Sequence, residues 1–167
     1  VHHADEIATA PQIDHSHDEI HPASLHEDCL LVTRDAYEDA AAHFWRYAQA
    51  NPDDPTARLY LARIHRRLGR YEMAAAQLDT AMDVASNDAD VMSEVGFLLI
   101  ETGRPDEAVE RFRSALSVDP RSEPAWIGLV TALRADGRPD AAERVLQRAP
   151  AALRSRLELP ADTATAP

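Results

Sequence analysis

The sequence of 167 residues has little of what several protein classes require. It holds one cysteine, Cys29, so no internal disulfide is possible. No apolar run approaches the roughly 20 residues of a membrane-crossing helix, and no transmembrane segment is expected. Its 17 basic residues, all arginine, face 29 acids. The net charge of −12 argues against nucleic acid or an anionic membrane as the main partner.

Signatures of catalysis are missing too. The sequence has no Gly-rich phosphate loop, no paired catalytic carboxylates and no metalloprotease His-Glu pattern. His26 and Cys29 lie three residues apart, but a nucleophile and its base need a third, orienting group. We interpret Cys29 as a buried small residue and His65 as a satisfied core histidine. The sequence therefore predicts a protein that is not an enzyme and binds no cofactor.

Small helix-forming residues dominate the chain. Apolar residues make up 45 % of it, aromatic residues only 5 %, and alanine is the commonest type. Alanine has the highest helix propensity, and its small side chain lets helices approach closely. The chain is also long enough to bury a core as one domain. These features predict an all-α fold.

A turn recurs at a fixed interval of 34 residues. The recurring residues are Gly69, Gly103 and Gly137, and likewise Ala74, Ala108 and Ala142. Each glycine can adopt positive φ and end one helix, while Pro105 and Pro139 suit the start of the next. A single helical hairpin cannot bury its own apolar face, but stacked copies can. The spacing therefore predicts three stacked hairpins, at 55–88, 89–122 and 123–156.

This pattern resembles the tetratricopeptide repeat family. The middle segment matches through Met92, Val95–Gly96, Leu99, Gly103, Ala108, Phe112, Ala115 and Pro120. The third matches through Trp126, Leu129, Leu133, Gly137, Ala142, Leu146 and Ala149. The first matches through Leu61–Ala62, Gly69, Tyr71, Ala74, Leu78 and Ala81, with Arg58 a departure. The resemblance implies an α-solenoid of helical hairpins.

The two ends of the chain are expected to differ from the central repeats. Ala40 and Phe44 lie one period before Ala74 and Leu78, which indicates a degenerate tetratricopeptide-like hairpin over 23–54. After the third repeat, Pro150 and the apolar Leu153 and Leu157 suggest a short capping helix. We expect residues 157–167 to hold the end of this helix and a loose tail.

Residues 1–22 are predicted to be a flexible, acidic leader, because they lack an apolar period. The weak metal-binding candidates here are His2, His3, His15, His17 and His21. Imidazole is the commonest transition-metal ligand, yet no Cys/His spacing of a structural zinc site is present. Opportunistic binding of Ni²⁺, Cu²⁺ or Zn²⁺ and a merely solubilising leader both remain open.

The resemblance also implies a site, since first helices of tetratricopeptide repeats line a concave groove that binds peptides or helices. Helical spacing places these residues there: Leu59, Tyr60, Arg63, Arg66, Arg67, Ser93, Glu94, Phe97, Ile100, Glu101, Ile127, Thr131 and Arg134. This map has a basic end at Arg63, Arg66 and Arg67 and an apolar middle. It predicts a protein or peptide ligand with apolar anchors and an acidic end, recognised by arginine through paired hydrogen bonds. An alternative is that the leader covers the groove.

Three functions fit these features. The first is a non-enzymatic scaffold or adaptor that binds other proteins in the cytoplasm. The second rests on a resemblance to class II type III secretion chaperones, which implies holding an apolar segment of a translocator-type client. The third is an envelope assembly or maturation factor, periplasmic after leader cleavage, with a weak metal-binding leader. Partner identity and oligomeric state stay open.

Overall fold

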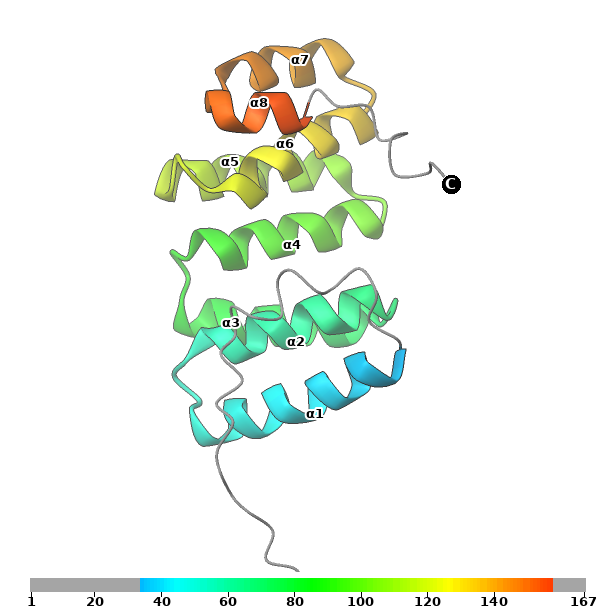
Figure 1. Cartoon of the computed structure of the whole chain (residues 1–167), viewed down its shortest axis with the longest axis vertical. Coiled ribbons are helices and arrows are strands. Elements are labelled where there is room, and N and C mark those ends of the chain that lie inside the picture. Colours follow the sequence, from blue (N-terminus) through cyan, green and yellow to red (C-terminus); the bar gives the residue numbers. More distant parts are fainter. Residues whose placement is uncertain (1–33, 158–167) are drawn as a thin grey trace, which may run out of the picture. The chain divides into compact units, whose positions relative to one another are not determined.

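The computed structural model describes residues 34–157 of the chain. Within that range the chain forms helices and no strands (Figure 1). The helices are α1 (Arg34–Ala50), α2 (Pro55–Arg67), α3 (Tyr71–Val84), α4 (Ala89–Glu101), α5 (Pro105–Val118), α6 (Glu123–Ala135), α7 (Pro139–Arg148) and α8 (Ala151–Leu157).

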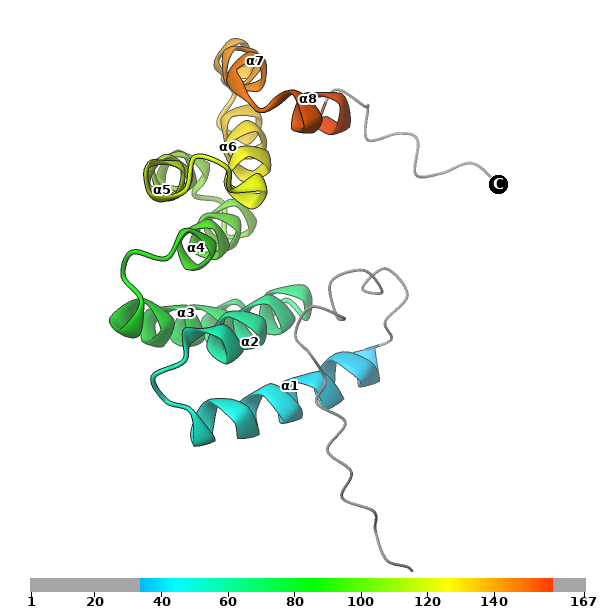
Figure 2. The same ribbon diagram turned by 60° about the vertical axis from the view of Figure 1, so that its left-hand side comes forward.

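The helices pair in chain order. Helix α2 packs on α3, α4 on α5 and α6 on α7, and both views show the pairs following one another along the stack (Figures 1 and 2). Helix α1 packs on α2, as a second helix of an earlier hairpin should, and the short α8 follows α7 with Leu153 buried. The predicted solenoid is therefore confirmed. The predicted first helix of the earlier hairpin lies outside the described residues.

Each hairpin turns at a glycine with positive φ, at Gly69 (70°), Gly103 (77°) and Gly137 (70°). In the first turn, Gly69 N–H donates to the Arg66 carbonyl at 3.0 Å and Arg70 N–H to the His65 carbonyl at 2.8 Å. The other two turns repeat these bonds. This pattern satisfies the last carbonyls of each first helix, which explains why glycine recurs at this step.

First and second helices begin differently. The first helices α2, α4 and α6 are capped by the side chains of Asp54, Asp88 and Ser122, which accept hydrogen bonds from backbone N–H groups of the first turn. The second helices α3, α5 and α7 have no side-chain cap; α5 and α7 start at Pro105 and Pro139, as the first helix α2 starts at Pro55. Proline lacks an N–H group, so it leaves one fewer donor to satisfy there.

Phe112 is the centre of the core around α4, α5 and α6. Its side chain is fully buried. A Cβ atom at Gly96 would lie 2.6 Å from the Phe112 ring, and one at Gly128 only 2.0 Å. The ring therefore occupies space that exists only because both neighbouring helices carry glycine.

The core at the other end is built from smaller side chains. Leu59 and Ala62 of α2 pack with Leu78 of α3 and with Val91 and Leu98 of α4. A separate small cluster joins α1 to α2 through Ala48, Ala57 and Leu61. The buried core of the first repeat is thus aliphatic and contains no buried aromatic ring like that of Phe112.

Candidate partner-binding face

Helices α2, α4 and α6 lie next to one another, and we call their shared surface the first-helix face. All the residues of the predicted groove lie on these three helices. Ten of them keep exposed surface: Tyr60, Arg63, Arg66, Arg67, Phe97, Ile100, Glu101, Ile127, Thr131 and Arg134.

Leu59, Ser93 and Glu94 are instead buried, with exposed fractions of 8 %, 1 % and 3 %. Leu59 packs in the core, and the Ser93 hydroxyl donates to the Ala89 carbonyl at 2.7 Å. Helical spacing alone placed these three on the groove. They are buried because each first helix packs against the next first helix as well as against the second helix of its own hairpin.

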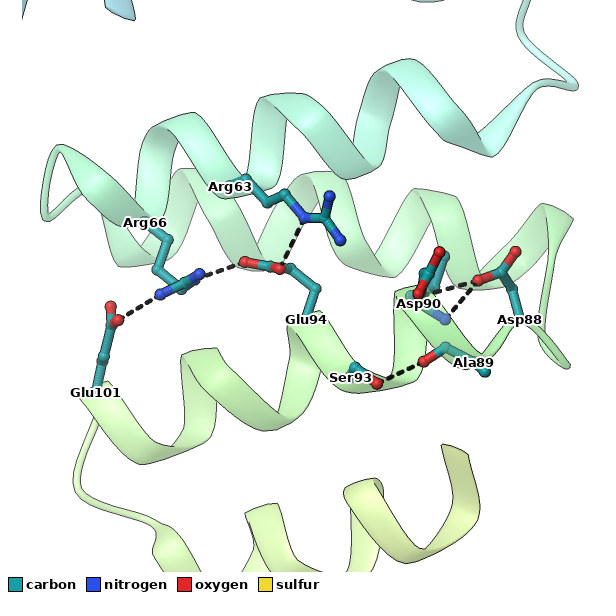
Figure 3. Close-up of polar contacts among 9 residues, drawn as sticks. Arg63, Arg66, Asp88, Ala89, Asp90, Ser93, Glu94 and Glu101 are labelled. Atoms are coloured by element: carbon teal, nitrogen blue, oxygen red, sulfur yellow. Dashed lines mark hydrogen bonds and ion pairs between the residues drawn. The ribbon is translucent and has the colours of Figure 1, made fainter. Parts of the chain in front are cut away.

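Four charged residues form what we call the charge cluster: Arg63 and Arg66 of α2 with Glu94 and Glu101 of α4 (Figure 3). Arg63 Nε donates to Glu94 Oε2 at 3.0 Å, and Arg66 Nε donates to Glu94 Oε1 at 2.6 Å. Arg66 Nη1 also donates to Glu101 Oε1. The cluster therefore ties the first repeat to the second across the first-helix face.

These ion pairs correct the charge map drawn from the sequence. Glu94 and Glu101 neutralise Arg63 and Arg66, so the predicted basic end keeps only the positive charge of Arg67. Arg67 alone of the three arginines makes no ion pair with another described residue. The terminal nitrogens of Arg63 likewise make no hydrogen bond to a described residue.

Aromatic rings hold both arginines in place. The Arg66 Cζ atom lies 5.4 Å from the centre of the Phe97 ring, and Arg63 Cζ lies 5.6 Å from the Tyr60 ring. Tyr60 in turn stacks on Phe44 of α1, with ring centres 4.8 Å apart and 15° between planes. Such contacts stabilise guanidinium groups and reduce the freedom lost on binding.

Arg66 is the most enclosed cation of the cluster. Burial works to lower its pKa, but the carboxylates of Glu94 and Glu101 outweigh that cost and raise the pKa above its usual range. Its side chain is 11 % exposed, against 25 % for Arg63. Arg66 therefore stays charged at every physiological pH and needs carboxylates around it.

A small open pocket of about 130 Å³ lies between the first turns of α2 and α4. Leu59, Tyr60 and Arg63 line it from α2, and Asp90 and Val91 line it from α4. The pocket adjoins the charge cluster through Arg63. It is the size of a side chain and not of a small-molecule cofactor.

The apolar middle of the face is half-buried. Phe97 and Ile100 pack against the core around Phe112, the two phenylalanine rings meeting edge to face at 5.1 Å and 69°. Ile127 of α6 is also half-buried. Phe97 and Ile100 pack against the core on one side, and all three side chains keep accessible surface.

His65 differs from its interpretation as a satisfied core histidine. It is buried, 7 % exposed, but its Nδ1 atom has no hydrogen-bond partner. Burial and the nearby Arg70 lower its pKa below the usual 6.5, while Glu38 acts in the opposite direction. Arg70 pairs with Glu38 of α1 through both guanidinium Nη atoms, so His65 lies at the contact between α1 and the first hairpin.

The charge cluster could have been predicted from the sequence by comparing residues one repeat apart. Neither the composition nor the spacing within a single helix shows it. Arg66 and Glu101 are 35 residues apart, and Arg63 and Glu94 are 31 apart. Both separations are close to one repeat period, so opposite charges fall on facing sides of adjacent first helices. Comparing charges one period apart would have paired them.

No group of three or more His, Cys, Asp or Glu side chains that suits a metal ion occurs within residues 34–157. The leader histidines proposed as weak ligands lie outside this range. Among the same residues, no helix has the length and apolar character to cross a bilayer.

Stacked helical hairpins with glycine turns define a class of repeat proteins whose hairpins carry interaction surfaces. Two models of the tetratricopeptide repeat family match the chain, one over residues 53–121 and the other over 99–159. The chain therefore belongs to the tetratricopeptide repeat family. Repeats of this family are typically non-catalytic interaction modules, which supports a role in protein interaction. No curated protein sequence matches the chain significantly.

Solved structures share the fold. MamA superposes with a TM-score of 0.59 at 18 % identity, over 74 % of this chain and 69 % of MamA. A thermophilic tetratricopeptide repeat protein of Thermus thermophilus gives 0.61 at 24 % identity, over 74 % of this chain and 67 % of its own. The O-GlcNAc transferase of Thermobaculum terrenum gives 0.65 at 22 % identity over 77 % of this chain, but only 24 % of the transferase is covered. At these identities the likeness concerns the fold alone.

Proposed function

We propose that the chain is a non-enzymatic scaffold that binds a peptide or helix of another protein on the first-helix face. The observation that carries this proposal is the half-buried strip of Phe97, Ile100 and Ile127, which neighbours the charge cluster. Apolar surface left accessible beside charged groups is typical of a protein-binding site. In this proposal the strip takes the apolar anchors of the partner.

The polar contacts of the partner follow from the arginines. Tyr60, Arg63 and Arg67 flank the strip on α2, and Thr131 and Arg134 flank it on α6. An acidic end of the partner would lie at the α2 side, as the sequence predicted. It would meet guanidinium groups that already have carboxylate partners in the free protein, except at Arg67 and the terminal nitrogens of Arg63.

Substitution on the two sides of the stack tests this proposal. Ile100→Ser with Ile127→Ser removes apolar anchors from the first-helix face. Met73→Ser with Val118→Ser is the matched control, since these exposed side chains, at 50 % and 43 %, lie on the second helices α3 and α5. We expect affinity capture from native lysate, read by mass spectrometry, to lose a specific protein with the first pair only. Equal capture by both pairs would contradict the proposal.

The same strip suits a secretion chaperone that shields an apolar client segment, and this is the second candidate. A gene for a translocator next to the encoding gene, and co-purification of that translocator, would favour it. Both of these proposals place the chain in the cytoplasm. The envelope assembly factor needs export instead, and detection of a cleaved leader in fractionated cells would favour that third function over the other two.

A further inference from the structure

The charge cluster has an inner and an outer carboxylate. Glu94 is 3 % exposed and accepts hydrogen bonds from both Arg63 and Arg66, so it is an integral part of the junction. Two guanidinium groups and one carboxylate leave a single positive charge. Glu101 neutralises this charge from the edge, bound to Arg66 Nη1.

Glu101 is held less firmly than Glu94. Its side chain is 35 % exposed and contacts one arginine only. It is also the last residue of α4, where the negative end of the helix dipole disfavours an acidic side chain, and the last turn contains no basic residue. The pair is enclosed on its Arg66 side and open to water on its Glu101 side, so Glu101 can leave while Arg66 needs another carboxylate in its place. Arg66 therefore offers a carboxylate position whose present occupant is held less firmly than Glu94.

We propose that this position on Arg66 is a recognition site for an acidic side chain of the partner, and that Glu101 is a built-in competitor that fills it in the free protein. The proposal rests on the proposed function and deepens it. On binding, a Glu or Asp of the partner accepts the hydrogen bond of Arg66 Nη1, and Glu101 moves out into water. The site stays neutral throughout, because one carboxylate replaces another.

The surroundings specify what the partner carries next to its acid. The Phe97 ring lies 5.4 Å from the Arg66 guanidinium, and Phe97 also borders the apolar strip. A carboxylate on Arg66 thus arrives beside the apolar anchor site. The partner segment that fits this site carries an acidic residue next to an apolar residue on the same surface. An apolar segment that lacks the acid leaves Glu101 on Arg66 and forgoes this contact, so the site favours segments that carry both groups.

The test uses the full chain and a random dodecapeptide library displayed on phage, whose peptides have no free C-terminal carboxylate. The wild type, Glu101→Gln and Arg66→Lys are each used for selection. Arg66→Lys keeps the positive charge but loses the planar donor pattern. Glu107→Gln is the matched control, because Glu107 is half-exposed and binds one arginine, Arg104, on the surface of α5. Circular dichroism and thermal melting check that every variant folds.

We expect the wild-type selection to enrich Glu or Asp beside an apolar residue. Synthetic peptides from it should bind Glu101→Gln about three- to fivefold more tightly, since the partly exposed carboxylate of Glu101 no longer competes for Arg66. They should bind Arg66→Lys roughly ten- to a hundredfold more weakly, because a hydrogen bond to a charged group is lost. Glu107→Gln should bind like the wild type. Replacing the acid of the peptide by Gln should abolish the gain seen with Glu101→Gln.

Other outcomes separate this inference from the proposed function. If the selected peptides lack acids, bind through the Ile100 and Ile127 strip and ignore Glu101→Gln, the competitor fails while the scaffold stands. If the synthetic peptides bind the wild type equally well after their acid is replaced by Gln, the partner chemistry stated here is wrong. If no variant enriches any peptide, the inference and the proposed peptide-binding face both fail.

Discussion

Two neighbouring junctions of the same stack are held together by different chemistry. Between the second and third repeats, the buried Phe112 ring fits against Gly96 and Gly128. Between the first and second repeats, aliphatic contacts are joined by the buried carboxylate of Glu94 and two arginines. The backbone repeat is the same on both sides, so it is the side chains that make one junction steric and the other electrostatic.

The difference separates stability from recognition. At the steric junction the Phe112 ring packs directly on two glycines. No other group can be accommodated there, because any atom added to a glycine would collide with the ring. An electrostatic junction at the edge of a face can exchange one carboxylate for another at small cost. The proposed recognition of an acid therefore belongs to the junction between the first two repeats, while the Phe112 ring fills the junction between the last two.

The steric junction is expected to show the largest effect. Phe112→Ala should lower the free energy of unfolding by about 3–5 kcal/mol, since it removes a fully buried ring that no neighbouring side chain can replace. Urea denaturation followed by circular dichroism measures this. The half-buried Phe44 of α1 is the comparison, and Phe44→Ala should cost clearly less. Equal losses would show that Phe112 is not a special wedge.

Gly128→Ala tests the same junction from the opposite side. The new methyl group would lie 2.0 Å from the Phe112 ring, so we expect a loss of about 1–3 kcal/mol by overpacking. Combining it with Phe112→Leu should give a smaller loss than the sum of the two single variants, because the shorter side chain makes room. Strict additivity in the double-mutant cycle would contradict the proposed fit.

The electrostatic junction should respond to Glu94→Gln with a smaller loss, about 1–2 kcal/mol. Fully buried ion pairs lose roughly 3–5 kcal/mol when one partner is removed, but the Arg63 side chain is 25 % exposed and reaches water. Glu107→Gln, on an exposed pair, should change stability by less than about 1 kcal/mol. Urea denaturation measures the free energy of unfolding of both variants. Equal losses would show that the buried pairs of Glu94 are no more stabilising than the exposed pair of Glu107.

The smallest effect concerns pH and the contact of α1 with the first hairpin. The folded-state pKa of His65 lies below 6.5, first because of burial and then because of Arg70. The unfolded chain therefore binds more protons below pH 6.5, and the free energy of unfolding should fall as the pH is lowered from there. The decline should be measurable down to about pH 4.5, where carboxyl groups begin to titrate.

His65→Phe provides the control for this dependence. It removes the titrating group and its unpaired nitrogen, so its stability should vary less between pH 6.5 and 4.5 than that of the wild type. Urea denaturation at several pH values gives both curves. Parallel curves would show that His65 does not contribute to the acid sensitivity.

The sequence predicted those features that depend on backbone conformation and on small size. The period of 34 located the positive-φ turns at Gly69, Gly103 and Gly137. The helix around Phe44 was also predicted, by aligning Ala40 and Phe44 with the residues one period later, and it runs from Arg34 to Ala50. In each case the fold requires a particular kind of residue at a fixed position of the repeat, so the requirement can be recognised in the sequence.

The fate of the charged side chains was not predictable in the same way. Glu94 and Glu101 lie seven residues apart on one face of α4, yet one is buried between two arginines and the other lies at the edge. That outcome depends on side-chain direction and on which repeat lies beside it. Helical spacing placed both the arginines and the two glutamates on the face, but the structure shows that they pair with each other.

The central claim is that partners bind on the first-helix face. Amide hydrogen exchange of the full chain with and without a peptide from the wild-type selection tests it most directly. We predict slower exchange in α2, α4 and α6 and unchanged exchange in α3, α5 and α7. Protection confined to the second helices would contradict the account.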